Sequence, residues 1–336
     1  MDTGMIKVVR LVLLMCVAVL ASCQPDEPKQ PVSIAPAEKK DAVPASPVFN
    51  ADSAFSYVKS QVDFGPRAMN TKNHEACGVW LIEKLKQFAD TVYIQKGDVK
   101  GWDGKTLKAT NIIASFLPKN SQRILIASHW DARPWADQDS IRPNDPVDAA
   151  NDGASGVGII IEMARLMKLN APPIGVDLIL LDAEDYGQPE DKKPYVPDSW
   201  CLGTQLWAKN PHVPGYYANY GILLDMVGAK DAVFAQERNS VQFARNIVEK
   251  VWNKATGLGY GRYFTFDSSG PITDDHVYIN SIAHIPCIDI IQHDPNSPSQ
   301  TFYKYWHTHN DKIDFIDRNT LKAVGQTLLE TIYNDK

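Results

Sequence analysis

The feature that most constrains the fold is a regular alternation of short apolar runs and amphipathic segments through the body of the chain. Residues 123–128 and 176–181 are nearly continuous apolar runs, which are typical of strands buried on both faces of a parallel sheet. Between them, residues 156–169 carry apolar side chains at helical spacing. Strands joined by helical crossovers predict an α/β domain with a central, mostly parallel twisted sheet and helices on both faces.

The rest of the body continues this pattern. We expect further helices at 51–62, 74–88, 201–209, 240–253 and 319–333, and further strands at 91–94, 110–116, 220–225 and 285–291. In the helix at 74–88, the spacing places Val79, Leu81, Ile82, Leu85 and Phe88 largely on one side. Because no repeat and no Gly/Ser linker interrupts residues 50–336, we expect a single globular domain there.

The N-terminus has the pattern of a targeting segment. A positive flank precedes ten apolar residues, 11–20, which are too few for the roughly 20 that a spanning helix needs. The following Leu20-Ala21-Ser22-Cys23 resembles a bacterial lipobox, although a plain signal peptide with a chance cysteine is the alternative. We therefore predict a lipoprotein signal peptide at 1–22 and a lipidated Cys23 that anchors the protein to a membrane. The expected location is the bacterial cell envelope, on the periplasmic or outer-membrane side.

Composition separates the next segment from the body and excludes one class of partner. Residues 23–49 are rich in Pro, Lys, Asp, Glu and Ala, so we predict a disordered stalk. The 34 basic and 40 acidic residues are interspersed and give a net charge of −6, which disfavours nucleic acid as a partner. The cysteines of the body, Cys77, Cys201 and Cys287, are odd in number and show no Cys-x-x-Cys pairing, so buried structural thiols are expected.

Residues that can bind metal follow the predicted strands. The candidate segments are His129-Trp130-Asp131, Asn151-Asp152-Gly153, Asp182-Ala183-Glu184-Asp185, Asp225, a loop with Asp274-Asp275-His276, and Trp306-His307-Thr308-His309. Because ligands collect at the carboxyl ends of parallel strands, we expect these side chains to converge. Clustered carboxylates and imidazoles need a cation, and mixed nitrogen and oxygen donors point to zinc.

Each candidate also has a structural interpretation. An Asp before a helix, such as Asp152, is most often its N-cap. Adjacent acids such as Glu184-Asp185 are usually a solvated pair, and His307 between Trp306 and Thr308 could be a satisfied core histidine. We expect structural roles for the histidines that lack a carboxylate motif at a strand end, namely His74, His212, His284 and His293. The combination of candidates at successive strand ends favours a site.

Together these segments resemble the zinc aminopeptidase (M28) superfamily, and most closely its glutaminyl cyclase branch as found in Bacteroidetes. The resemblance extends from Phe64-Gly65-Pro66-Arg67 to the C-terminal helix and includes Asp198-Ser199-Trp200-Cys201-Leu202-Gly203-Thr204 and Leu224-Asp225-Met226-Val227-Gly228-Ala229. It implies cyclisation of the N-terminal glutamine of peptides or proteins to pyroglutamate, with release of ammonia.

The resemblance also implies roles for individual residues. Asp152, Asp185 and His307 would bind one zinc, Glu184 would be the acid/base, and Asp225 and Asp275 would complete the catalytic site. Trp306 and Phe302 would line the substrate pocket. Many members have Glu where this chain has Asp185, and carboxylates of either length bind zinc, so we regard this as a tolerated variation. The substrate would need a free N-terminus.

Two other functions remain open at this point. In a two-zinc aminopeptidase, which the resemblance also allows, His129 and Asp225 would hold the second zinc, Asp152 would bridge the ions and Glu184 would activate water. Trp130, the Asp274-Asp275-His276 segment and Trp306 favour the cyclase by resemblance. A catalytically inactive, lipid-anchored binding protein is a third interpretation, which the intact Glu184, Asp225 and metal ligands disfavour.

Overall fold

The computed structural model describes residues 46–296 and 302–335. The predicted signal peptide at 1–22, the anchor residue Cys23 and most of the predicted stalk lie outside the described residues. The helices are α1 (Ala51–Val62), α2 (Lys72–Lys86), α3 (Ala154–Leu169), α4 (Leu202–Lys209), α5 (Arg238–Gly257), α6 (Asp275–Ser281) and α7 (Arg318–Tyr333), with a 3-10 turn η1 (Ile313–Phe315). The strands are β1 (Thr91–Lys100), β2 (Thr106–Phe116), β3 (Arg123–His129), β4 (Gly175–Leu181), β5 (Gly221–Asp225), β6 (Phe234–Gln236), β7 (Phe264–Ser268) and β8 (Cys287–Ile291).

The central sheet has the order β1-β2-β4-β3-β5-β8. Strands β4, β3, β5 and β8 run parallel; at one edge β2 pairs antiparallel with β4, and β1 pairs antiparallel with β2. The prediction of a mostly parallel sheet is confirmed. Strands β6 and β7 form a separate two-stranded sheet.

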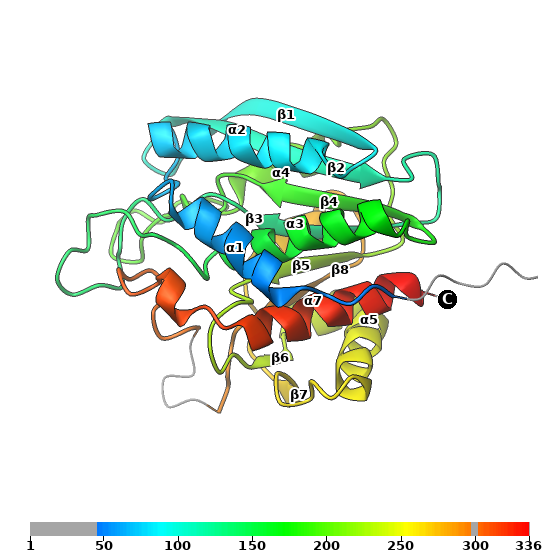
Figure 1. The fold of residues 1–336 in the computed structure, drawn as a ribbon. Coiled ribbons are helices and arrows are strands. Elements are labelled where there is room, and N and C mark those ends of the chain that lie inside the picture. Colours follow the sequence, from blue (N-terminus) through cyan, green and yellow to red (C-terminus); the bar gives the residue numbers. More distant parts are fainter. Residues whose placement is uncertain (1–45, 297–301, 336) are drawn as a thin grey trace, which may run out of the picture. The chain divides into compact units, whose positions relative to one another are not determined.

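Side chains alternate along the buried strands, so each face of the sheet presents apolar side chains that helices cover. On β3, Ile124 and Ile126 pack into a core shared with α1, α2, α3, α5 and α7, while Leu125 and Ala127 face a second core that includes Trp207 of α4 and Ile279 of α6. Figure 1 shows α1, α2, α3 and α7 in front of the sheet. Helices therefore lie on both faces, as the sequence predicts.

Two expectations about packing are wrong. Val79 is 62% exposed, because the buried side of α2 is formed by His74, Cys77, Gly78, Leu81 and Leu85, and Val79 lies off this stripe. Phe49, assigned above to the stalk, is only 2% exposed. Its ring packs against Gly325 of α7, and its backbone N–H donates to Gln326 Oε1 over 2.9 Å. The packed domain thus includes Phe49.

The segment around Asp275 differs from the expected loop. Asp274 is the N-cap of α6, and its carboxylate accepts a hydrogen bond from the backbone N–H of Asp275, which begins the helix. With seven residues, α6 is too short for a clear periodic pattern. The short strands β6 and β7 were likewise not predicted.

Candidate active site

Strand ends and nearby loops bring the predicted ligand residues together in one cavity of about 320 Å³. Asp152 lies just before α3, Glu184 and Asp185 follow β4, Asp225 ends β5, and His307 lies in the loop before η1. Each of these five side chains is at most 9% exposed. Glu184-Asp185 is therefore not a solvated surface pair.

Asp152, Asp185 and His307 form a compact set of donors. His307 Nε2 lies 3.1 Å from Asp185 Oδ1 and 3.6 Å from Asp152 Oδ2. Asp185 Oδ2 is buried and has no hydrogen-bond partner among the described residues. Two carboxylates, one imidazole and an unpaired buried oxygen fit a zinc ion with a fourth position open to substrate.

The turn before α3 aims Asp152 at this centre instead of at the helix. The N-cap of α3 is Gly153, which makes no side-chain capping bond, so the capping interpretation of Asp152 is wrong. Asp311 holds the turn by accepting the backbone N–H groups of Asn151 at 2.9 Å and Asp152 at 3.1 Å. Burial and the neighbouring Asp152 raise the pKa of Asp311 to about 7.

His129 defines a second donor set that shares Asp152. Its Nε2 lies 3.0 Å from Asp152 Oδ1 and 3.2 Å from Asp225 Oδ1. Burial opposes a charged ring, but the surrounding carboxylates of Asp131, Asp152 and Asp225 outweigh burial and hold the pKa of His129 well above its usual value. The geometry therefore accommodates either a hydrogen-bonded His129 or the second ion of the aminopeptidase alternative.

Glu184 is held beside the donors by two residues whose roles the sequence did not reveal. Asp131 accepts the backbone N–H groups of Glu184 and Asp185, each over 3.1 Å. The Cys201 thiol donates to Glu184 Oε1 over 3.3 Å. Burial, supported by Asp185 and Asp274 and opposed by His129, raises the pKa of Glu184 well above its usual value. A buried carboxyl with a raised pKa can carry protons near neutral pH.

A charged pair supports His307 from behind. Its Nδ1 lies 3.1 Å from Asp137 Oδ1, and Asp137 accepts two hydrogen bonds from Arg133, at 2.7 and 3.1 Å. Trp306 stacks on the His307 ring with centroids 3.8 Å apart. A carboxylate on Nδ1 leaves Nε2 to face the donors, so His307 is more than a satisfied core histidine.

The two remaining predicted catalytic residues, Asp225 and Asp275, differ in position, and Asp274 lies beside them. Asp225 and Asp274 line the cavity. Asp275 is fully buried behind it and accepts a hydrogen bond from Thr204 over 2.5 Å. Burial raises the pKa of Asp225 to about 6, and that of Asp274 and Asp275 to about 7 each. Of the candidate segment Asp274-Asp275-His276, the residue that lines the cavity is thus Asp274, to which the sequence analysis gave no separate role.

Aromatic residues form the outer wall of the cavity. The predicted Trp306 and Phe302 both line it, with ring centroids 4.9 Å apart. Trp200 and His293 line it as well. The expectation that His293 is only structural is therefore wrong. His293 follows the end of β8 by two residues, so its place after a strand was a signal that the lack of a neighbouring carboxylate motif outweighed in the sequence analysis.

Backbone strain also occurs at the site. Ala183, Met226 and His307 have φ values of 53°, 48° and 53°, which L-residues rarely adopt. Ala183 precedes Glu184, and Met226 follows Asp225. Such conformations persist where the surrounding structure fixes them, and they often mark functional sites.

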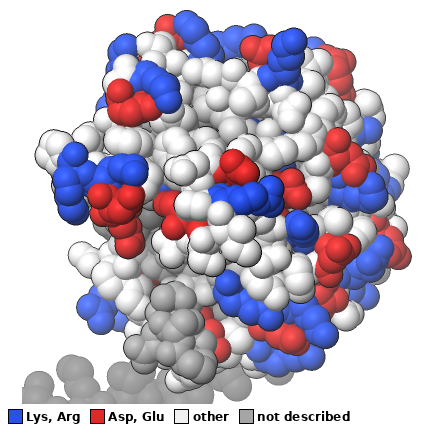
Figure 2. Space-filling model, turned by 90° about the vertical axis from the view of Figure 1, so that its left-hand side faces the viewer, with Lys and Arg blue, Asp and Glu red and all other residues white. Residues whose placement is uncertain are grey.

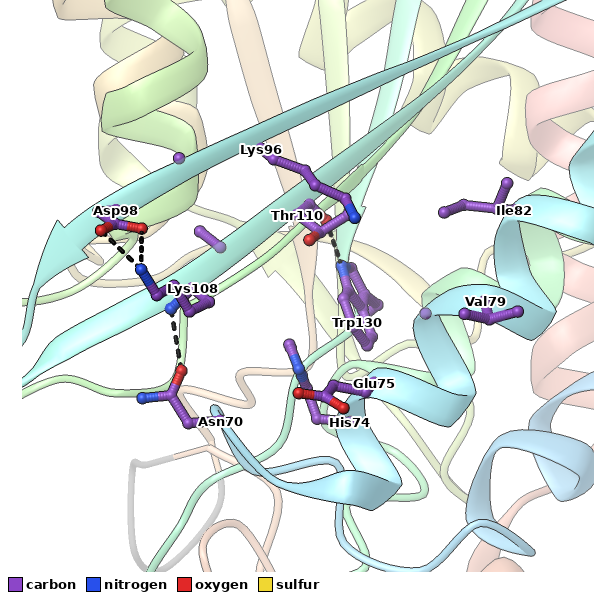
Figure 3. A pocket seen from close by; sticks show the side chains of 13 residues that line it. Asn70, His74, Glu75, Val79, Ile82, Lys96, Asp98, Lys108, Thr110 and Trp130 are labelled. Atoms are coloured by element: carbon purple, nitrogen blue, oxygen red, sulfur yellow. Dashed lines mark hydrogen bonds and ion pairs between the residues drawn. The ribbon is translucent and has the colours of Figure 1, made fainter.

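Trp130 points away from the site, into a different cavity of about 390 Å³ between α2 and the β1–β2 hairpin (Figure 3). Its indole stacks on His74 at 4.2 Å and donates to the Thr110 carbonyl over 3.1 Å. His74 Nε2 in turn lies 2.8 Å from Asp182 Oδ1. Trp130 and His74 therefore support the ends of β3 and β4 from behind.

Charges of both signs share the face of the molecule that Figure 2 presents. Among the described residues, no helix is both long and apolar enough to span a membrane. Cys77, Cys201 and Cys287 are free and buried, as expected.

Fold and site together define a metal-dependent α/β enzyme, and the chain belongs to peptidase family M28, whose family model matches residues 111–332. Two solved structures are similar along most of the chain. A Zn-dependent exopeptidase from Parabacteroides distasonis is 55% identical with a TM-score of 0.84, covering 86% of this chain and 100% of that one. A glutaminyl cyclase from Bacteroides thetaiotaomicron, bound to N-acetylhistamine, is 51% identical with a TM-score of 0.84, covering 87% of this chain and 100% of that one.

A more distant relative is the glutaminyl-peptide cyclotransferase of Bos taurus. It is 23% identical over 249 residues, which are 65% of this chain and 64% of the bovine protein. The match thus spans slightly less than two thirds of that relative.

Proposed function

We propose that this protein is a zinc-dependent glutaminyl-peptide cyclotransferase, which converts the N-terminal glutamine of peptides or proteins to pyroglutamate and releases ammonia. One observation carries the proposal. The Bacteroides thetaiotaomicron protein described as a glutaminyl cyclase is 51% identical over 87% of this chain. Asp152, Asp185, His307 and Glu184 of this chain meet in one cavity, where that chemistry needs a metal and a proton carrier.

The reaction needs no nucleophile from the protein. The α-amine attacks the side-chain amide carbon of the same glutamine, the new C–N bond closes a five-membered ring, and the bond to the amide nitrogen breaks. Because both reacting groups belong to one residue, orienting them supplies much of the lowering of the barrier. Asp152, Asp185 and His307 would hold a zinc ion, which would polarise the amide carbonyl when bound.

Glu184 moves the proton. Its Oε1 accepts the Cys201 thiol, which leaves Oε2 to take the proton from the attacking amine and deliver it to the departing ammonia. Asp225 and Asp274 line the cavity beside it and can hold the protonated or neutral amine. Trp306, Phe302 and Trp200 enclose the glutamine side chain and exclude water.

The second candidate is a two-zinc aminopeptidase, which one specific observation favours. His129, Asp152 and Asp225 form a donor set beside the first. With both sets filled, Asp152 would bridge the ions and Glu184 would activate water against the N-terminal peptide bond.

Mass spectrometry of a Gln-initiated peptide separates the two. Cyclisation removes one ammonia and leaves the chain intact, whereas an aminopeptidase shortens it by one residue. Acetylating the α-amine should abolish cyclisation, and the rate should rise as the pH approaches the amine's pKa, about 7.7–8.0. A product shortened by one residue would contradict the cyclase function and support the aminopeptidase.

The lipid anchor is a separate part of the proposal. The lipobox-like Leu20-Ala21-Ser22-Cys23 supports a protein tethered to the cell envelope, acting on peptides or proteins there. Cys23→Ser should move the protein from the membrane fraction to the soluble fraction without changing its specific activity. Unchanged partitioning would remove the lipobox interpretation.

A further inference from the structure

A second cavity, of about 750 Å³, lies against the residues that support His307. Asp137 and Gln138 line it. Asp137 contacts His307 Nδ1 over 3.1 Å, and the Gln138 N–H donates to the His307 carbonyl over 3.2 Å. The cavity therefore adjoins the active-site cavity, which His307 itself lines.

A stack of side chains links the two cavities. The Arg133 guanidinium lies 4.5 Å from the Trp200 ring and 5.0 Å from the Trp135 ring. Trp200 lines the active-site cavity, and Trp135 lines the second one. Arg133 thus makes a cation–π contact with one aromatic side chain in each wall.

The second cavity combines aromatic surface with negative charge. Trp102 meets Trp135 edge-to-face with centroids 6.0 Å apart. Neither indole N–H has an acceptor among the described residues. The charged residues of the lining are Asp137, Glu190, Asp191 and Lys192.

One of these charges, that of Glu190, is left without a partner of opposite charge among the residues described. Asp137 is neutralised by Arg133, and Asp191 pairs with Lys192 at the surface. Glu190 is exposed and makes no ion pair within the described chain. Aromatic rings beside one uncompensated carboxylate favour a cationic side chain.

We propose that this cavity is an extended subsite for the peptide substrate, which receives the residues beyond the first two and favours arginine or lysine there. The proposal rests on the cyclase function. The active-site cavity of about 320 Å³ encloses the N-terminal glutamine, so a longer peptide must continue past its rim. Each residue extends the chain by about 3.3–3.6 Å, so the third to fifth residues can reach a neighbouring cavity.

The test compares kcat/KM for Gln-Ala amide with that for pentapeptide amides beginning Gln-Ala and carrying Arg or Glu at position 3, 4 or 5. The protein is used with its zinc. At one of these positions, Arg should be preferred over Glu by about tenfold, the effect expected of one cation–π contact with a charge pair. Equal rates for Arg and Glu at all three positions would overturn the proposal.

Reversing the charges of Glu190 and Asp191, called the lip pair here, tests whether the preference for Arg arises at this cavity. Glu190→Lys with Asp191→Lys should abolish or invert the Arg preference and leave kcat/KM for Gln-Ala amide unchanged. The matched control, Glu83→Lys with Glu249→Lys, reverses two exposed charges on α2 and α5 and should retain the preference. Trp102→Ala should lower kcat/KM for the Arg pentapeptide alone.

The outcomes separate this proposal from the one it rests on. If the wild-type protein does not release ammonia from Gln-Ala amide, the cyclase function fails. If it does, but the control pair changes the preference as much as the lip pair, or the lip pair slows the dipeptide equally, the subsite is overturned.

Discussion

At the scale of single residues, the chemistry depends on where Glu184 is held. It follows a residue with positive φ, its backbone N–H binds Asp131, and its Oε1 accepts the Cys201 thiol. These contacts keep the carboxylate beside the donor set while Asp185 turns toward His307. The side chains of two adjacent acids thus take different roles because of their neighbours.

We predict that Glu184→Gln retains zinc and loses nearly all turnover, by about 10²–10⁴-fold. The amide keeps the size of the side chain and the contact with Cys201, but it cannot take up and release a proton. Ammonia release and metal content are measured on the same preparation. Glu83→Gln, at an exposed position, is the control. Retention of most of the activity by zinc-loaded Glu184→Gln would show that the acid/base assignment is wrong.

The support that Asp137 gives to His307 should be measurable as zinc affinity, without an activity assay. Asp137→Asn should weaken zinc binding by about 10–100-fold, because a carboxylate on Nδ1 orients the ring and makes Nε2 a better donor. Competition with a chelator measures this affinity. Asp145→Asn, an exposed position on the same loop, should leave it unchanged. Equal affinities for the two variants would contradict the role of Asp137.

At the scale of elements, the site depends on the start of α3 lying directly on the ends of β3 and β5. A Cβ at Gly156 would lie 2.8 Å from the Leu224 carbonyl oxygen and still closer to Ser128 Oγ. A Cβ at Gly153 would lie 2.7 Å from His129 Cε1. The glycines therefore allow Asp152 to approach the histidines.

We expect Gly156→Ala to lower the free energy of unfolding by about 1–3 kcal/mol, because the backbone of β5 cannot give way as a flexible side chain would. Urea denaturation measures the change, and a weaker zinc affinity should accompany it. Gly257→Ala in α5, where a Cβ meets nothing within 4 Å, should be neutral or stabilising by up to about 1 kcal/mol. If the two variants unfold alike, close packing at Gly156 does not position the site.

The elements themselves could largely be predicted from the sequence. The helix at 51–62 has the predicted bounds, and the predicted strand at 176–181 differs from β4 by one residue. Their long, uniform patterns reflect burial that the local sequence records. The three-residue β6 and the seven-residue α6, which begins within a run of charged residues, are too short to carry such a pattern.

At the scale of the whole molecule, proton and metal binding are coupled through the histidines. Burial and the nearby Arg133 both oppose a positive charge on His307. Asp185 and Asp137 favour that charge more strongly, so the pKa of His307 is raised above 6.5. In the metal-free protein, this raised pKa stabilises the fold below pH 6.5, and the stabilisation is lost as the pH rises through the folded-state pKa. Zinc requires the neutral ring.

The increase in Tm caused by a fixed zinc concentration should therefore grow between about pH 5 and pH 8. Thermal unfolding with zinc and with a chelator, at each pH, measures it. A zinc-induced shift that is constant or shrinks over this range would contradict the assigned ligands.

The candidate site could be predicted in part. Asp152, Asp185, Asp225 and His307 stand at strand ends or beside small residues, where the fold class and the family resemblance give each a meaning. Asp131, Asp137 and Cys201 act through contacts between loops far apart in the chain, and no local pattern records such contacts. The same limit explains why the sequence did not distinguish Asp274 from Asp275. Only Asp274 lines the cavity, because the start of α6 sets the direction of each side chain.

The central claim is that one zinc, held by Asp152, Asp185 and His307, is sufficient for cyclisation. Titrating zinc into the metal-free protein, while ammonia and free amino acid are measured from a Gln-initiated peptide, tests it most directly. We predict that ammonia release reaches its full rate at one zinc per chain, with no amino acid released. Full activity only at two zinc ions per chain, with release of free glutamine and loss of the second ion in His129→Ala, would contradict it.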